Sequence, residues 1–210
     1  GQSDAQSGHM SIRELERLRD DNIVGMVRAL KRTGSGAGGV VKTHESSLDL
    51  TEEKDGLPVT VRRQVPTSWT DYNGHMNETH YLEAASLAND RLMELVGADA
   101  QYVASGLSYF TVESHIRYLD EVHAGNQLTI TTQVLSGEGK KMHLFHRLWR
   151  SDGTLSATVE TLLLHTDLNA RRTCEPKPEV AKKLADLAQS HAAYQTEGVG
   201  RYVGQPRAAG

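Results

Sequence analysis

A short polar segment near residue 70 carries the side chains best suited to chemistry. It reads WTDYNGHMN over residues 69–77, and a helical pattern follows from about Glu78. The first turn of a helix leaves backbone N–H groups unpaired, and such groups can hold a carbonyl oxygen that becomes negative during acyl transfer. Asp71, three residues before Gly74, could activate water or attack the acyl carbon itself. The segment therefore predicts acyl transfer, and a purely structural role of Asp71 in capping the turn is the alternative.

Five segments around this junction predict an antiparallel sheet. Apolar and polar residues alternate along them as in half-buried strands, and glycine- or aspartate-containing turns connect the last four. Short turns of this kind favour antiparallel neighbours. The predicted strands span residues 57–65, 108–119, 128–135, 142–149 and 155–166.

One long helix, from about residue 78 to residue 96, separates the first strand from the others, with Gly97 as its expected C-cap. Ala84, Ala85, Ser86 and Ala88 make its first half slim, so it can lie close to a curved sheet. We therefore expect an α+β fold in which a curved antiparallel sheet of about five strands wraps around this helix, with extra N- and C-terminal helices. The expected inward stripe of the long helix is Leu82, Ala85, Ala88, Leu92 and Leu95.

The composition excludes several classes of function. The chain has 210 residues, and 23 basic against 27 acidic side chains leave a formal charge of −4. That balance predicts no nucleic-acid partner, and the lack of an apolar run of about 20 residues predicts no membrane span. The one cysteine, Cys174, cannot form an internal disulfide. These features predict a reduced, soluble, cytoplasmic protein.

Metal, serine and cysteine chemistry have little support in the sequence. His75 and His80 are five residues apart, while His143 and His146 fall on opposite faces of a strand, so neither pair has convincing metal-ligand spacing. We therefore predict no metal. The sequence has no Gly-x-Ser-x-Gly nucleophile elbow, and no base is evident beside Cys174. Nucleophilic serine and cysteine are not expected.

The motif Asp71-x-x-Gly74-His75-x-Asn77-x-x-x-Tyr81 resembles the signature of the 4-hydroxybenzoyl-CoA thioesterase-like family of hot-dog-fold proteins. The stretch VESHIRYLDEVHAGNQLTITTQVL (112–135) resembles the second and third strands of that family, and the likeness covers about residues 57–168. The family hydrolyses acyl-CoA thioesters with the motif aspartate as nucleophile or general base. The resemblance therefore implies that Asp71 is the catalytic carboxylate of an acyl-CoA thioester hydrolase.

The same resemblance implies roles for the other residues of the motif. The N–H groups near Gly74 and His75 would polarise the thioester carbonyl, while Asn77 and Tyr81 would shape the helix start and the pocket. No cofactor is implied beyond the coenzyme A carried by substrate and product. The chain departs from the commonest pattern at Glu78, where many members have a second asparagine.

The resemblance also implies an assembly. Hot-dog proteins of this kind pair as dimers whose sheets join, with active sites at the subunit boundary, so we expect a homodimer or a dimer of dimers. Glu113, His115 and Arg117 share one face of their strand, where a solvated or ion-paired role is the alternative to a functional one. Because this strand borders the acyl pocket of the family, Glu113 is the second candidate carboxylate.

The eleven aromatic residues are few for a chain of this length, so their grouping carries information. Trp69 and Tyr72 flank Asp71, and Tyr109 with Phe110 opens the next strand. Rings beside a carboxylate such as Glu113 suit a quaternary ammonium group, with ordinary core packing as the alternative.

The N-terminal region suggests which acyl group carries such a charge. RELERLRDDNIVGMVRALK (13–31) resembles the end of the dehydrogenase half of L-carnitine dehydrogenases, some of which carry a fused C-terminal hot-dog thioesterase. A glycine-rich stretch, TGSGAGG (33–39), follows it. The resemblance implies hydrolysis of betainyl-CoA to glycine betaine and CoA in carnitine breakdown, in a chain fused to, or working with, a carnitine dehydrogenase.

These observations divide the chain into five regions. Residues 1–10 are expected to be a cloning scar or disordered, 11–32 a helical remnant of an upstream dehydrogenase, 33–56 a flexible linker, 57–168 the hot-dog thioesterase domain, and 169–210 a C-terminal helix and tail.

Coenzyme A carries phosphates, which require cations at the mouth of the pocket. Lys140 and Lys141 in a tight turn, together with Arg150, are the candidates, and ordinary solvated side chains are the alternative. Two other functions also stay open. One is a non-catalytic module that binds acyl-CoA or dimerises, and the other is a hot-dog hydratase, which typically uses a differently placed Asp-His pair.

Overall fold

The computed structural model describes residues 52–205. The expected scar, the helical remnant at 11–32 and most of the expected linker lie outside the described residues. The elements within the described range are β1 (Glu53–Lys54), β2 (Leu57–Gln64), η1 (Thr67–Trp69), α2 (Glu78–Leu95), α3 (Ala100–Ala104), β3 (Leu107–Tyr118), β4 (Gln127–Ser136), β5 (Lys141–Arg150), β6 (Leu155–Asp167), β7 (Arg172–Thr173) and α4 (Pro178–Ser190).

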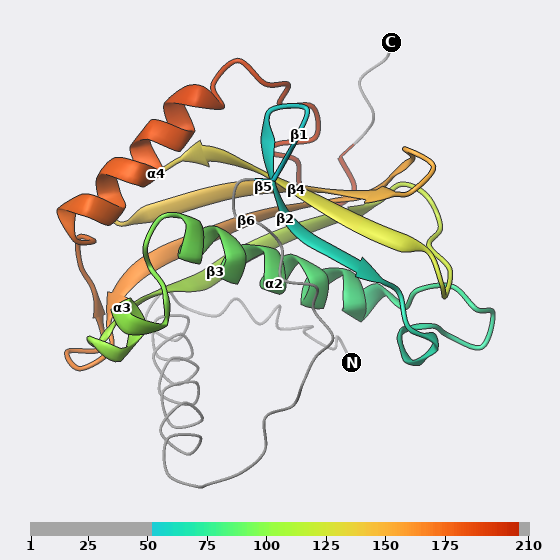
Figure 1. Ribbon diagram of the computed structural model, residues 1–210, viewed down its shortest axis with the longest axis horizontal. Coiled ribbons are helices and arrows are strands. Elements are labelled where there is room, and N and C mark those ends of the chain that lie inside the picture. The colour runs from blue at the N-terminus through green and yellow to red at the C-terminus, as the bar shows by residue number, and fades with distance from the viewer. Residues whose placement is uncertain (1–51, 206–210) are drawn as a thin grey trace, which may run out of the picture.

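The sheet is antiparallel and curves around α2 (Figure 1). Its strand order is β1-β2-β4-β5-β6-β3, with the short β7 pairing with β6. The five predicted strands correspond to β2 through β6, so the α+β architecture expected from the sequence is confirmed. The short strands β1 and β7 were not predicted, and β1 lies at the end of the segment expected to be a linker. The long strand β3 lies at one edge of the sheet.

Helix α2 packs closely against the sheet through small side chains, as its composition predicted. Ala84, Ala85 and Ala88 are buried to within 1% of full burial. The predicted inward stripe was wrong at Leu82, whose side chain is 46% exposed, whereas Leu95 is partly buried and packs against the core. The buried face instead runs through Tyr81, Ala84, Ala85, Ala88, Asn89, Leu92 and Met93.

A second part of the core lies where α2 ends. Val180 and Leu184 of α4 pack in one buried cluster with Leu92 and Val96 from the end of α2. Gly137, after β4, lies directly beneath Leu184, and a Cβ atom there would come within 2.4 Å of that side chain. Helix α4 therefore completes the core of the domain instead of lying apart from it.

A buried polar network ties α2 to the sheet. Thr60 of β2 and Thr132 of β4 share a hydrogen bond of 2.8 Å between their hydroxyls. The Thr132 hydroxyl donates to Nδ1 of His146 at 2.9 Å, and Nε2 of His146 donates to Oδ1 of Asn89 on α2 at 2.8 Å. Burial lowers the pKa of His146 to about 3, so this imidazole is neutral in the folded protein.

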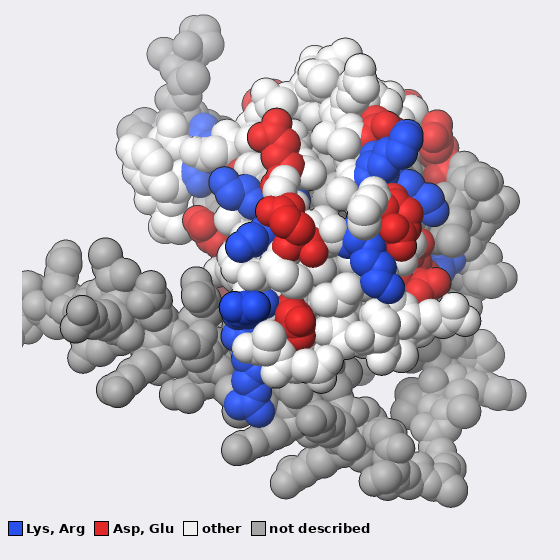
Figure 2. All heavy atoms as spheres, turned by 90° about the vertical axis from the view of Figure 1, so that its left-hand side faces the viewer, with Lys and Arg blue, Asp and Glu red and all other residues white. Residues whose placement is uncertain are grey.

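The surface agrees with the charge balance. On the side of the molecule shown in Figure 2, the visible acidic and basic side chains are interspersed, with no extended region of one sign. Within residues 52–205, no helix has the length and apolar character needed to span a bilayer.

Candidate functional site

The loop between η1 and α2 is closed by its own backbone. The amide of Asp71 donates to the carbonyl of His75 at 2.8 Å, and the amide of Gly74 donates back to the carbonyl of Asp71 at 3.0 Å. Gly74 has a φ of +79°, a conformation that residues with a Cβ atom adopt only with strain. The turn at Asn73 and Gly74 therefore gives the loop a defined shape.

The Asp71 carboxylate is part of that closed loop. Its Oδ1 atom accepts hydrogen bonds from the backbone amides of Asn73, at 2.8 Å, and His75, at 3.1 Å. The two amides predicted to polarise a thioester carbonyl, those of Gly74 and His75, are thus both paired inside the loop. The capping role that was the alternative for Asp71 is present in the structure, and a substrate oxygen would have to take the place of the carboxylate at the His75 amide.

Asn77 fixes the start of α2. Its Oδ1 atom accepts from the backbone amide of Thr79 at 3.1 Å and from the Thr79 hydroxyl at 2.9 Å. Its own amide donates to the carbonyl of Trp69 at 2.8 Å. Asn77 therefore acts as the N-cap and also ties the helix start to the preceding 3-10 turn.

A groove of about 680 Å³ opens beside this helix start. Its two rings, Tyr81 and Tyr118, meet edge to face with centroids 5.1 Å apart. Burial, with Tyr118 and Glu121 nearby, raises the pKa of Tyr81 to about 12. We call this the acidic groove because three carboxylates line it, of which Asp120 pairs with Arg150. It is lined by His75, Met76, Glu78, Tyr81, Tyr118, Leu119, Asp120, Glu121 and Val122.

Most of the aromatic residues predicted to bind substrate lie outside the acidic groove. Trp69 is buried and stacks on His80 with ring centroids 4.9 Å apart, and the Arg63 guanidinium lies 4.0 Å from the centroid of the indole. Tyr72 is 96% exposed at the tip of the loop. The predicted aromatic cluster is therefore not formed within one chain, because these rings occupy the core and the solvent instead of one pocket.

The residues at the start of β3 are also separate from the acidic groove. Tyr109 and Phe110 are both buried, and the ring of Tyr109 packs edge to face against His165 at 4.9 Å. Glu113 is exposed and lines a different pocket of about 470 Å³, together with Lys141. Within one chain, Glu113 does not meet the Asp71 loop.

The three cations predicted to bind CoA do not converge in one chain. Lys140 precedes β5, Lys141 begins it and Arg150 ends it, and ten residues of strand span about 30 Å. Arg150 pairs with Asp120 and Asp152, each at 3.0 Å, and its hydrogen bond to Asp152 raises its pKa. The expected single cluster at the pocket mouth is thus divided between two ends of the sheet.

A different set of cations does converge. A groove of about 590 Å³, here called the arginine groove, is lined by Arg117, Arg147 and Arg201, and it shares Leu119 with the acidic groove. Burial lowers the pKa of Arg147, whose guanidinium donates to the carbonyl of Gln195 at 2.6 Å. Sequence reasoning missed this set because its members come from β3, β5 and the C-terminal segment, which are distant along the chain.

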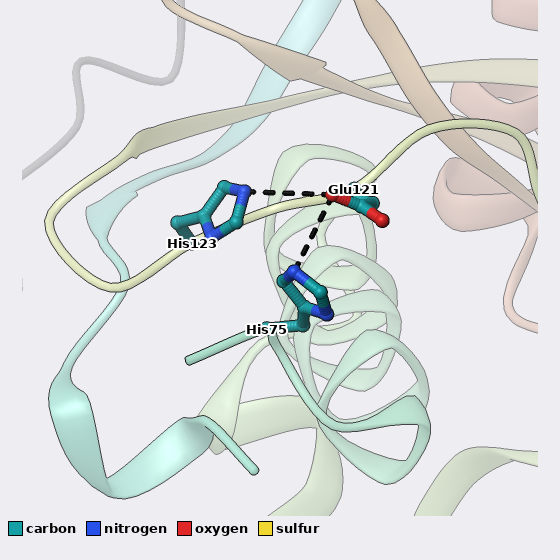
Figure 3. Close-up of side chains that lie close together, drawn as sticks. All are labelled: His75, Glu121 and His123. Carbon is teal, nitrogen blue, oxygen red and sulfur yellow. Dashed lines mark ion pairs between the residues drawn. The ribbon is translucent and has the colours of Figure 1, made fainter. Parts of the chain in front are cut away.

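One cluster could hold a metal ion. His75 and His123 both place a ring nitrogen near the Glu121 carboxylate, at 3.4 and 3.7 Å (Figure 3). Among the described residues, this is the group of three histidine, cysteine or acidic side chains whose ligand atoms all lie within 4.8 Å of one another. The sequence predicted no metal because its neighbouring histidines lack ligand spacing, whereas His75 and His123 are 48 residues apart.

Cys174 has a histidine beside it that the sequence did not indicate. Its sulfur lies 3.4 Å from Nδ1 of His165. The same Nδ1 donates to the carbonyl of Cys174 at 3.0 Å, and Nε2 accepts from the Tyr102 hydroxyl at 2.8 Å. Because Nδ1 carries the proton, His165 has no free lone pair for the thiol, and burial raises the pKa of Cys174. The contact does not make a nucleophilic pair.

Comparison with known proteins identifies the fold. Residues 65–184 match the family model of the thioesterase-like superfamily. A hypothetical protein of Staphylococcus aureus, solved in complex with CoA, is similar over 74% of this chain and all of its own, with a TM-score of 0.67 and 23% identity. A putative thioesterase of Pseudomonas putida is similar over 71% of this chain and 97% of its own, with a TM-score of 0.62 and 34% identity. The fold is the hot-dog fold expected from the sequence.

Curated relatives are also similar in sequence. The L-carnitine dehydrogenase/betainyl-CoA thioesterase of Ruegeria pomeroyi is 50% identical over 98% of this chain, which spans 44% of that protein. The betainyl-CoA thioesterase of Pseudomonas aeruginosa is 39% identical over 70% of this chain and 94% of its own length. This chain thus spans less than half of the two-function relative and nearly all of the one-function relative.

Proposed function

The chain belongs to the thioesterase-like superfamily, and on that basis we propose that it hydrolyses an acyl-CoA thioester whose acyl group is betainyl, releasing glycine betaine and CoA. Relatives that carry the name betainyl-CoA thioesterase support the proposal at 50% and 39% identity. The chemistry of the acidic groove supports the choice of acyl group independently of those names.

The acidic groove is the observation that carries the proposal. A trimethylammonium group has no N–H donor, so it is recognised by aromatic faces and nearby negative charge. Tyr81 and Tyr118 supply the rings, while Glu78 and Glu121 supply the charge, since the third carboxylate, Asp120, pairs with Arg150. A neutral acyl group of the same shape would receive no such stabilisation there.

The arginine groove suits the other end of the substrate. Arg117, Arg147 and Arg201 come from three separate parts of the chain, and guanidinium groups bind phosphate oxygens well. Because Leu119 borders both grooves, one molecule could place its cationic acyl group in the first and its phosphates in the second. We therefore propose these arginines for CoA binding in place of Lys140, Lys141 and Arg150.

The proposed reaction uses the Asp71 loop. As a general base, Asp71 takes a proton from water while the water oxygen bonds to the thioester carbon; the C–S bond then breaks and the proton passes to the CoA sulfur. As a nucleophile, Asp71 would bond to the thioester carbon and the C–S bond would break, releasing CoA as a thiolate and leaving a mixed anhydride. Water would then hydrolyse the anhydride and supply the proton that the CoA sulfur takes up. In both routes the thioester carbonyl oxygen accepts a hydrogen bond from the His75 amide, which donates to Asp71 in the structure without substrate.

We propose that the chain works as a homodimer or a dimer of dimers in the cytoplasm. Strand β3 supports dimerisation because, within residues 52–205, its twelve residues form an edge of the sheet, and a long edge strand favours pairing with a second copy. The relatives with a dehydrogenase name support a link to carnitine oxidation, either as part of one longer chain or between separate proteins.

A matched pair of substrates tests the proposal. Betainyl-CoA and 3,3-dimethylbutanoyl-CoA differ only in the nitrogen or carbon at the centre of three methyl groups, so they share shape and differ in charge. We expect kcat/KM, followed by thiol release, to be at least about tenfold higher for betainyl-CoA, in line with two ring contacts to a desolvated cation. Equal rates would reject the betainyl assignment while leaving thioester hydrolysis intact, and no thiol release from any acyl-CoA would reject both.

A further inference from the structure

We infer that His75, Glu121 and His123 form a binding site for a divalent metal ion of the zinc type. His75 comes from the loop before α2, while Glu121 and His123 come from the segment between β3 and β4. The three side chains point toward one another at the surface (Figure 3). The site adjoins the acidic groove, since two of its members also line that groove.

The spacing of the ligand atoms fits tetrahedral coordination. Zinc bonds to histidine nitrogen and carboxylate oxygen at about 2.0–2.2 Å, which places neighbouring ligand atoms about 3.3–3.6 Å apart in a tetrahedron. The Glu121 oxygen lies 3.4 Å from Nε2 of His75 and 3.7 Å from Nε2 of His123. Small side-chain rotations would bring all three atoms to one ion.

The backbone that carries the two histidines is already in place. His75 and His123 face each other as an isolated antiparallel bridge, and the amide of Met76 donates to the carbonyl of Val122 at 2.7 Å. The amide of His123 donates to Oδ1 of Asn126 at 2.8 Å, which holds the second segment in a tight turn. A metal would therefore need little backbone rearrangement.

The ligand types select the metal. Two imidazoles and one carboxylate suit zinc and its transition-metal neighbours, whereas magnesium and calcium prefer oxygen ligands throughout. Three protein ligands leave a fourth position for water. The site is partly exposed, with Glu121 64% accessible, so an ion can reach it from solvent.

A metal ion bound at this site would change the charge of the acidic groove. Glu121 is one of its three carboxylates, and a bound dication would cancel that negative charge. A consequence that rests on the proposed function follows: the metal should weaken binding of a cationic acyl group and leave a neutral one unaffected. Metal binding itself does not depend on that function.

Calorimetric titration of the full chain with Zn²⁺, and visible absorption with Co²⁺, test the site without any substrate. We expect saturable binding with a tetrahedral cobalt spectrum, and an affinity lower by about tenfold or more in Glu121→Gln and in His123→Ala. His143→Ala is the matched control, because it removes a histidine that pairs with Glu160 at 2.8 Å outside the cluster. The His143→Ala protein should bind Zn²⁺ and Co²⁺ with the affinity of the unaltered protein.

Two results would overturn the inference. One is an affinity that Glu121→Gln and His123→Ala leave unchanged, and the other is a cobalt spectrum that stays octahedral in the unaltered protein. Kinetics then test the consequence separately. Zn²⁺ should raise KM for betainyl-CoA several-fold and leave KM for 3,3-dimethylbutanoyl-CoA unchanged, whereas an equal effect on both substrates would contradict competition at Glu121.

Discussion

The carboxylate of Asp71 accepts a hydrogen bond from the backbone amide of His75 at 3.1 Å. Asp71, which is proposed to start hydrolysis, thus accepts from the same His75 amide that is proposed to stabilise the oxyanion. In the protein without substrate, the two groups satisfy each other and keep the loop in shape. Binding of a thioester would exchange one acceptor for another at the same amide, which requires no large movement of the loop.

Replacing Asp71 separates its structural role from its chemical one. The Asp71→Asn variant keeps a side-chain oxygen for the amides of Asn73 and His75, but its carboxamide cannot act as a base. We expect kcat to fall by about 10²–10⁴-fold, with a melting temperature close to that of the unaltered protein. Asp71→Ala should lose activity and also melt at a lower temperature, because the loop amides lose their acceptor.

Thiol release measured with a thiol-reactive dye, alongside thermal unfolding, checks both variants. If Asp71→Asn released CoA at the original rate, Asp71 would have only its capping role. If the unaltered protein bound acyl-CoA without releasing thiol, the non-catalytic binding module would be favoured.

The ring of Tyr118 should matter only for a cationic acyl group. Tyr118→Leu removes one of the two rings of the acidic groove, so kcat/KM for betainyl-CoA should fall about 3- to 30-fold, while that for 3,3-dimethylbutanoyl-CoA should change little. Tyr118→Phe keeps the ring and should keep most of the preference. Tyr72→Leu, which alters an exposed tyrosine outside the groove, is the control. A similar loss for both substrates would point to a packing defect instead.

Arg117 should contribute to recognition of the CoA phosphates. Arg117→Gln removes one charge from the arginine groove, so KM should rise about tenfold for every CoA thioester. Betainyl-pantetheine lacks the nucleotide phosphates, and its KM should not respond. Lys141→Gln provides the comparison, since it alters a cation at the start of β5, outside the arginine groove. A larger effect of Lys141→Gln than of Arg117→Gln would return CoA binding to the cations first predicted from the sequence.

The exposed edge strand should control assembly. Val112 lies on β3 and is 40% exposed. Val112→Lys would place two like charges near each other if two β3 strands pair, so we expect the mass in solution to halve without loss of secondary structure. Light scattering after size exclusion measures the mass. Val203→Lys changes an exposed valine in the C-terminal segment and should leave the mass unchanged, and a Val112→Lys protein of unaltered mass would show that β3 is not the interface.

His146 should make the protein less stable in mild acid. Its pKa is about 3 in the fold and 6.5 for an ordinary histidine, so between these pH values the unfolded chain takes up a proton that the folded protein does not. The free energy of unfolding therefore falls as the pH falls through this window, by about 2 kcal/mol from pH 7 to pH 5 for this group.

Urea unfolding at pH 7, 6 and 5 measures this loss. His146→Gln should be less stable at pH 7, because the bonds to Thr132 and Asn89 are disturbed, but its stability should depend less on pH. His115→Gln, which lies outside this network, is the control. A slope in His146→Gln as steep as in the unaltered protein would assign the pH dependence to other groups.

The order of the strands and the long helix followed from the sequence because their signals are local. Alternation of apolar and polar residues identified the five long strands, and small residues at 84–86 and 88 indicated how closely α2 approaches the sheet. Asn77 and Gly74 also have roles that depend on their immediate neighbours: one caps the helix, and the other adopts a positive φ. Such features are determined by a few adjacent residues, so the sequence alone was sufficient for them.

Only the tertiary structure shows which side chains from distant segments of the chain come into contact. Tyr118 joins Tyr81, and His123 joins His75, only because the end of β3 and the following segment pack against the start of α2. The three arginines converge for the same reason, and the rings of Trp69 and Tyr109 enter the core because the sheet closes over them. Residue types and local spacing determined the family and the Asp71 loop, whereas contacts between distant segments decided which groups line the grooves, because those contacts depend on how the sheet curves around α2.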